Sequence, residues 1–125
     1  MAVDDAMVPR ITPEQAKAMM ASGNALVVDV RETHELMRTG KIAGALHVPC
    51  GAIETRADPQ TPHYDKAFDK GKAIILYCAA GERSALSGAI LKTMGYGDVY
   101  NLGGFRDWVA SGGSVETLPR TRPEP

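Results

Sequence analysis

The sequence lacks the features that mark several large classes of protein. It contains only two cysteines, and its formal net charge is −1. Two cysteines do not make a disulfide framework, and a near-neutral charge favours neither nucleic acid nor a membrane surface as a partner. No apolar run approaches the ~18 residues of a transmembrane helix, and residues 1–10 lack a basic-then-apolar secretion signal. We therefore expect a cytoplasmic protein whose thiols stay reduced.

Short apolar segments alternate with helical patterns along the 125 residues. This alternation predicts one α/β domain with a mainly parallel sheet. We expect an N-terminal extension (1–10), the domain itself (11–111) and a C-terminal tail (112–125), whose last residues, 119–125, are expected to be disordered. The expected strands are 25–31, 44–49, 72–78 and 98–102; the expected helices, with their caps, are 12–24, 32–40, 84–97 and 103–113; a surface loop is expected over 55–65.

The most informative stretch is "ILYCAAGERSALSG", residues 75–88. An apolar strand ends there at Cys78, and a helix follows within a few residues. The first turn of a helix presents unpaired N–H groups, and a tight loop can turn its N–H groups inward around an anion. The segment 79–81 is Ala-Ala-Gly, which leaves that backbone unobstructed. A thiol at the centre ionises more easily, Arg83 adds positive charge, and Ser84 can cap the helix and donate to the sulfur.

Such a loop suits a cysteine that carries negative charge before and after it reacts. A persulfide is one such species, and a thiophosphate ester is another. In parallel sheets, ligands bind at the carboxyl ends of strands, which is where Cys78 is expected to lie. The plain alternative is a buried core cysteine, the common fate of this residue type. The small residues after Cys78 and the helix behind them favour a nucleophile over a core residue.

Several separated segments resemble the rhodanese domain, a sulfurtransferase family. "LYCAAGERSALSGAILKTMGYGDVYNLGGFRDW" resembles the active-site loop of that family, the helix after it and the last strand. "VVDVRETHELMRTGKIAGALHVP" resembles its Asp-Val-Arg-Glu segment and its Gly-His-Ile-x-Gly-Ala segment, which ends in proline. Together these segments cover roughly residues 11–111, in the order and spacing of the family.

The resemblance implies a fold and an activity. The implied fold is a rhodanese-like three-layer α/β domain whose central, mostly parallel sheet has five strands and is flanked by helices. In the implied activity, a sulfane sulfur passes from a small-molecule donor, thiosulfate or a persulfide, to Cys78 and then to a thiophilic acceptor such as cyanide or a thiol. A protein can take the place of either small molecule, and no metal or organic cofactor is needed. Asp29 and Arg31 match the supporting positions of the family. The implied substrate-binding cradle comprises Ala79, Ala80, Gly81, Glu82, Arg83 and Ser84.

The sequence departs from the family pattern at two positions. Lys41 stands where the family has the histidine of its Gly-His-Ile segment, a position that we expect to be structural. Glu82 places a carboxylate in the loop, where relatives that prefer thiosulfate often carry basic residues. An exposed carboxylate repels a dianionic donor by about 1 kcal/mol, and Arg83 offsets part of this repulsion. We therefore expect thiosulfate to be a poor donor compared with a persulfide or a protein.

Two other functions stay open. Phosphatases and arsenate reductases of related fold wrap a tetrahedral oxyanion in a Cys-x5-Arg loop, whereas four residues separate Cys78 from Arg83. The shorter loop offers fewer inward N–H groups, which suits a single sulfur better than a phosphoryl group. The second alternative is a non-catalytic rhodanese-like module for binding or regulation, because a fold alone does not settle function. The presence of Cys78 argues against this module.

The remaining candidates carry weaker signals. Successive histidines stand 13 and 16 residues apart, which is not a metal-ligand spacing, so we expect no metal site. These residues are His34, His47 and His63. Cys50 follows a proline without a loop of small residues, and a structural thiol is favoured there over a resolving cysteine. Phe105 and Trp108 stand at helical spacing and are expected in the core.

Overall fold

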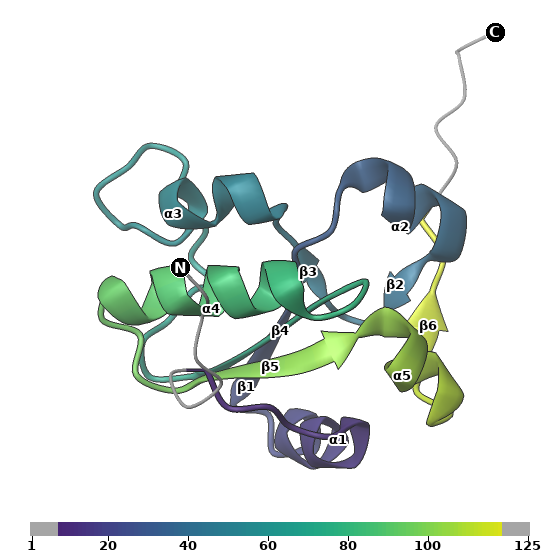
Figure 1. Ribbon diagram of the computed structural model, residues 1–125. Helices are drawn as coiled ribbons and strands as arrows, with labels where there is room; N and C mark the ends of the chain where they lie inside the picture. The colour runs from purple at the N-terminus through teal and green to yellow at the C-terminus, as the bar shows by residue number, and fades with distance from the viewer. Residues whose placement is uncertain (1–7, 119–125) are drawn as a thin grey trace, which may run out of the picture.

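A parallel sheet forms the centre of the computed structural model, which describes residues 8–118 (Figure 1). Its four strands lie in the order β3-β1-β4-β5, and each neighbouring pair is parallel. The predicted α/β class with a mainly parallel sheet is therefore confirmed. The strands are β1 (Ala25–Asp29), β3 (Leu46–His47), β4 (Ala73–Cys78) and β5 (Val99–Gly104).

A short extended segment at residues 9–11 lies beside β5. Arg10 forms a single parallel bridge with Asn101. The backbone N–H of Asn101 donates to Pro9 O at 2.8 Å, and that of Ile11 donates to Asn101 O at 3.1 Å. Within residues 8–118 the pairing is limited to this single bridge, since Pro9 has no N–H to donate and a helix begins at Pro13. Within residues 8–118 the main sheet thus has four strands and not five.

Helices cover both faces of the sheet and complete three layers (Figure 1). They are α1 (Pro13–Ala21), α2 (Thr33–Thr39), the 3-10 helix η1 (Cys50–Ala52), α3 (Ile53–Arg56), α4 (Glu82–Thr93) and α5 (Phe105–Ala110). Side chains of β4 alternate between the two faces. Ile74, Leu76 and Cys78 belong to the core that includes residues of α3 and α4. Ile75 and Tyr77 belong to the core that includes residues of α1 and α5. The sulfur therefore lies on the face that α4 covers.

Most predicted elements are present, with changed boundaries. The predicted capping box starts α1, because Gln15 N–H donates to Thr12 Oγ1 at 3.1 Å and Thr12 N–H donates to Gln15 Oε1 at 2.8 Å. The strand predicted over 44–49 is only two residues long, as β3. α3 extends into the start of the loop predicted over 55–65. Trp108 and Phe105 are buried in the core, as expected.

A second, two-stranded sheet has no counterpart among the predictions. In it, β2 (Lys41–Ile42) pairs antiparallel with β6 (Val115–Glu116). β6 lies within the predicted tail, at 112–125, while the disorder predicted for 119–125 falls outside the described residues. Residues 1–7 of the predicted extension also fall outside them. Among residues 8–118, no helix has both the length and the apolar character that a membrane crossing requires.

Candidate active site

Cys78 is the last residue of β4, and the loop after it places its sulfur against the start of α4. Its side chain is buried, with 1% of the residue exposed. The backbone N–H of Gly81 donates to Cys78 Sγ at 2.9 Å. Gly81 has a φ of +111°, a left-handed conformation that glycine adopts without steric cost. This conformation turns the chain tightly enough for an N–H three residues later to reach the sulfur.

The surroundings of Cys78 act on its ionisation in opposite directions. Burial raises the pKa of the thiol, because it penalises the charged form. Hydrogen bonds from the Ser84 hydroxyl and from the backbone N–H groups of Ser84, Gly81 and Ala80 outweigh burial, so the pKa lies below its ordinary value. The thiolate is the nucleophilic form of cysteine. The loop therefore favours a reactive sulfur.

Ser84 contacts the sulfur, but it does not cap the helix as predicted. α4 begins earlier, at Glu82, and Gly81 occupies the N-cap position. The Ser84 hydroxyl is buried within reach of three acceptors: Asn101 Oδ1 at 2.7 Å, Gly81 O at 3.1 Å and Cys78 Sγ at 3.5 Å. Its single proton serves one of them at a time. Ser84 is thus a buried neighbour of the sulfur in the first turn of α4.

Asn101 of β5 joins this site, although the sequence analysis did not single it out. Its Nδ2 donates to Gly81 O at 3.1 Å, and its Oδ1 accepts from Gly103 N–H at 2.9 Å and from Ser84. The side-chain amide of Asn101 therefore links β5 to the loop through hydrogen bonds. Gly104, the last residue of β5, also approaches the loop: a β-carbon there would lie 2.6 Å from Ala79 O. Only a glycine leaves room for this approach.

Arg83 interacts with a carboxylate that the sequence analysis also missed. Its Nη1 and Nη2 donate to Oε1 and Oε2 of Glu35 in α2, at 2.7 and 2.9 Å. This bond is the main cause that holds the pKa of Glu35 at about 2, and it raises the pKa of Arg83. The charge of Cys78 contributes to the raised pKa of Arg83 as well. The charges of both Glu35 and Cys78 therefore act on Arg83.

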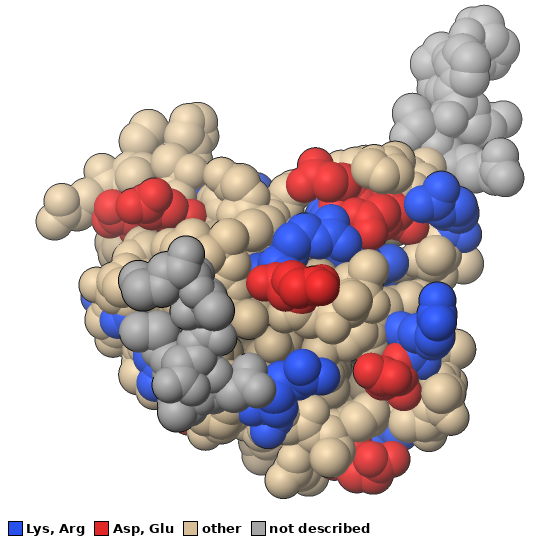
Figure 2. Space-filling view, in the orientation of Figure 1, with Lys and Arg blue, Asp and Glu red and all other residues tan. Residues whose placement is uncertain are grey.

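The outer face of the loop is open to solvent. Ala79, Ala80 and Glu82 are exposed, whereas Gly81 and Cys78 are buried beneath them. Glu82 stands in the first turn of α4, where a carboxylate interacts favourably with the helix dipole. Figure 2 shows acidic and basic side chains intermixed on this face of the molecule, rather than a patch of one sign.

Asp29 and Arg31 form a buried ion pair at the carboxyl end of β1. Arg31 Nη2 donates to Asp29 Oδ2 at 2.8 Å, and Arg31 Nε donates to Oδ1 at 3.1 Å. Arg31 also donates to Thr39 Oγ1 at 2.9 Å and to Gly40 O at 2.8 Å, and its guanidinium lies 4.4 Å from the ring centre of Phe105. The pair thus anchors the end of α2 and the start of α5. Within residues 8–118, its hydrogen bonds do not reach the Cys78 loop.

The other residues that the sequence singled out lie outside the loop. Cys50 is a half-buried free thiol whose Sγ donates to Arg83 O at 3.8 Å. Lys41 is buried and donates to Ala45 O at 2.6 Å, which suits a structural position. His47 bonds Arg31 O at 2.7 Å through Nε2. His34 and His63 are both exposed.

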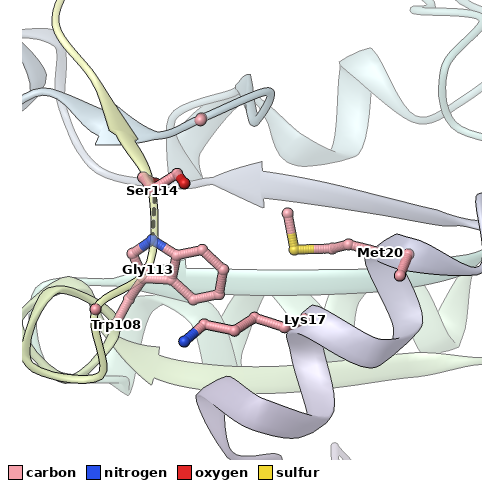
Figure 3. Close-up of a pocket in the computed structure, with 8 residues that line it drawn as sticks. Lys17, Met20, Trp108, Gly113 and Ser114 are labelled. Carbon is pink, nitrogen blue, oxygen red and sulfur yellow. Dashed lines mark hydrogen bonds between the residues drawn. The ribbon is translucent and has the colours of Figure 1, made fainter.

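A pocket of about 540 Å³ lies on the other face of the sheet (Figure 3). Figure 3 shows Trp108 across from Lys17 and Met20 of α1, with the Trp108 Nε1–H bonded to Ser114 O at 2.9 Å. Its lining contains no cysteine, histidine or carboxylate. The polar side chains in this lining are Lys17 and Ser114, and the Cys78 loop lies outside the pocket.

Comparison with known proteins places this fold and loop in a family. The family model of the rhodanese-like domain matches residues 12–111. The thiosulfate sulfurtransferase GlpE of Stutzerimonas stutzeri is 35% identical over 100 residues, which cover 79% of this chain and 83% of that protein. The human thiosulfate:glutathione sulfurtransferase is 24% identical over 108 residues, which cover 81% and 93%.

A solved structure from Rhodopseudomonas palustris, described as a protein of unknown function and possible tyrosine phosphatase, superposes with a TM-score of 0.82. It is 35% identical, and the match covers 90% of this chain and 87% of that chain. Because the family model spans most of the sequence, the resemblance drawn from its motifs is confirmed. The chain belongs to the rhodanese-like domain family.

Proposed function

We propose that this protein, a sulfurtransferase of the rhodanese type, carries sulfane sulfur as a persulfide on Cys78. The Cys78 thiolate attacks the outer sulfur of a donor, and a new S–S bond forms as the bond between that sulfur and the donor breaks. The leaving group keeps the electron pair; with thiosulfate it is sulfite. A thiolate or cyanide then attacks the terminal sulfur and releases the Cys78 thiolate. Atoms and electrons balance in both steps without a metal or an organic cofactor.

The contact of Cys78 Sγ with the Gly81 N–H, at 2.9 Å, carries this proposal. Both the thiolate and the persulfide are anions, so each gains from an N–H group and from the positive end of α4. Ala79 and Ala80 are exposed, which leaves the outer side of the loop open to a donor. We propose that residues 79–84 form the substrate cradle and that Asp29 and Arg31 support it through α2.

The relatives support particular donors and acceptors. The name of the Stutzerimonas protein supports thiosulfate as a donor, and that of the human protein supports glutathione as an acceptor. The exposed carboxylate of Glu82 supports a less charged donor, such as glutathione persulfide or a protein persulfide. We propose a cytoplasmic location, because a reducing compartment keeps thiols such as Cys50 and Cys78 free.

Intact-mass spectrometry tests the persulfide directly. Wild type incubated with thiosulfate or glutathione persulfide is expected to gain the mass of one sulfur atom, and cyanide is expected to remove it. Cys78→Ser should gain no sulfur, whereas Cys50→Ser, the matched control, should gain it as wild type does. If wild type stays unmodified with both donors, the catalytic proposal fails.

The Rhodopseudomonas neighbour makes a phosphatase the second candidate. The loop speaks against it, since only four residues separate Cys78 from Arg83, and Arg83 donates to Glu35. Assay with p-nitrophenyl phosphate separates the two: Cys78-dependent turnover there would favour the phosphatase. A non-catalytic binding module would show neither activity and would keep its partners in Cys78→Ser.

A further inference from the structure

We propose, on the basis of the function proposed above, that Glu35 gives this site its preference for sulfur donors of low negative charge. Glu35 acts through Arg83, so it is a positioning residue and does not itself touch the reacting sulfur. It lies in α2, well apart in sequence from the loop that holds the nucleophile. Neither the family match nor the loop motif assigns it a role.

Glu35 holds the guanidinium of Arg83 by two hydrogen bonds, from Nη1 to Oε1 at 2.7 Å and from Nη2 to Oε2 at 2.9 Å. Glu35 Oε1 also accepts the backbone N–H of Glu32 at 2.9 Å, which fixes the carboxylate at the start of α2. The exposed fraction of the side chain is 17% for Glu35 and 35% for Arg83. The pair is therefore a fixed, two-point contact at the edge of the site, and it occupies donors that a bound anion would otherwise use.

The charge of Glu35 is present throughout the physiological range, because Arg83 holds its pKa at about 2. It cancels the positive charge of Arg83 beside the loop. Glu82 adds an exposed negative charge, and Arg10 adds a positive one: its Nη1 lies 3.4 Å from where a β-carbon of Gly81 would stand. When ionised, these four charged side chains sum to zero. The charges of these four side chains therefore offset one another, and the attraction that remains for an anion comes from the N–H groups of the loop and the start of α4.

Donor charge then decides which donor binds well. Thiosulfate carries two negative charges, whereas an alkanethiosulfonate carries one and transfers the same kind of sulfur. In Glu35→Gln the guanidinium of Arg83 is no longer held by a carboxylate, so its positive charge can act on the donor, and it acts twice as strongly on the dianion. At surface dielectric and ordinary salt, this changes the preference between the two donors by about three- to tenfold.

The test compares the rates at which Cys78 gains sulfur from thiosulfate and from methanethiosulfonate. In Glu35→Gln, the ratio of kcat/KM for thiosulfate to that for methanethiosulfonate should rise about three- to tenfold, mainly through a lower KM for thiosulfate. Glu14→Gln, which removes the same charge from α1, should leave the ratio unchanged. A purely structural role of Glu35 would change both rates by the same factor, and that outcome would overturn the proposal.

A second background shows whether the effect passes through Arg83. Arg83→Gln has no guanidinium that the loss of Glu35 could free. Adding Glu35→Gln to it should therefore change the kcat/KM ratio of the two donors by less than twofold. An equal rise in both backgrounds would mean direct repulsion by Glu35 and would refute its action on Arg83. Failure of wild type to take sulfur from either donor would instead defeat the proposed function, so the two failures are distinguishable.

Discussion

Ser84 connects the sulfur of Cys78 to β5 through Asn101. Burial raises the pKa of Cys78, but hydrogen bonds to the sulfur lower it by more than burial raises it. The bond from the Ser84 hydroxyl makes the largest contribution among them. In Ser84→Ala, burial remains and this donor is lost, so the pKa should rise and less thiolate should be present at neutral pH. The ultraviolet absorbance of the thiolate, followed against pH in a Cys50→Ser background, should show its midpoint at higher pH. Sulfur loading at neutral pH should be slower.

Ser87 provides the matched control one turn further along α4. Its buried hydroxyl has no hydrogen-bond partner among residues 8–118, so Ser87→Ala removes no donor from the sulfur. The titration midpoint of Cys78 should stay where it is in wild type. If Ser84→Ala also leaves the midpoint unchanged, the Ser84 proton serves Asn101 Oδ1 or Gly81 O and not the sulfur, and the backbone N–H groups lower the pKa by themselves.

Gly104 controls the shape of the loop through its missing side chain. A β-carbon there would lie 2.6 Å from Ala79 O, a backbone atom that cannot simply rotate away. Gly104→Ala should therefore displace the loop, reduce the free energy of unfolding by about 1–3 kcal/mol and slow sulfur loading more than tenfold. Urea unfolding and intact-mass kinetics measure the two effects.

Gly97→Ala is the control for this substitution, because a β-carbon at Gly97 would meet no atom within 4 Å. Its free energy of unfolding should stay within about 0.5 kcal/mol of wild type. Wild-type loading rates in Gly104→Ala would show that the loop tolerates the shift, and the close approach would then have no role in the chemistry.

At the scale of elements, the ion pair of Asp29 with Arg31 attaches α2 to the sheet. Both side chains are buried, and Arg31 binds the end of α2 through Thr39 and Gly40. Asp29→Asn leaves a buried guanidinium without its counter-ion, so the free energy of unfolding should fall by about 3 kcal/mol. Urea unfolding at neutral pH measures this loss.

A second Asp–Arg pair of the chain supplies the comparison. Arg56 Nη2 lies 3.1 Å from Asp65 Oδ2, but the two side chains are 34% and 25% exposed. A solvated pair contributes little, so Asp65→Asn should cost less than about 1 kcal/mol. Equal losses in the two variants would show that the burial of Asp29 does not set the strength of its pair.

The elements that the sequence predicted well carry their signals locally. The capping box of α1 and the apolar run of β4 are complete within a few residues, and both elements are present. β2 and β6 are two residues each, and they form only because Lys41 and Ile42 meet residues 115–116. Nothing in a two-residue segment reveals a partner so far along the chain. The five strands implied by the family are four within residues 8–118, where Arg10 adds only a single bridge beside β5.

At the scale of the whole molecule, the candidate site also contains a part that the local sequence predicts and a part that depends on distant residues. The loop at 78–84 is contiguous, so its composition was enough to predict that Gly81 and Ser84 lie near the sulfur. Glu35 is 48 residues from Arg83 in sequence, and Asn101 is 17 residues from Ser84. Their roles arise from the packing of α2 and β5 around α4. A carboxylate three residues after Glu32 indicates a helix start, but it does not indicate a distant arginine.

The Glu35–Arg83 bond joins α2 to α4 and should make the stability of the whole molecule depend on pH. The pKa of Glu35 is about 2 in the folded protein, below the ordinary value of about 4.3 for the unfolded chain. Its stabilisation is therefore complete above the unfolded value and is lost as the pH falls towards the folded one. Wild type should exceed Glu35→Gln by about 1 kcal/mol at neutral pH. Urea unfolding of both proteins should show this difference vanish between about pH 5 and pH 2. A difference that stays constant with pH would mean that packing, and not charge, holds the two helices together.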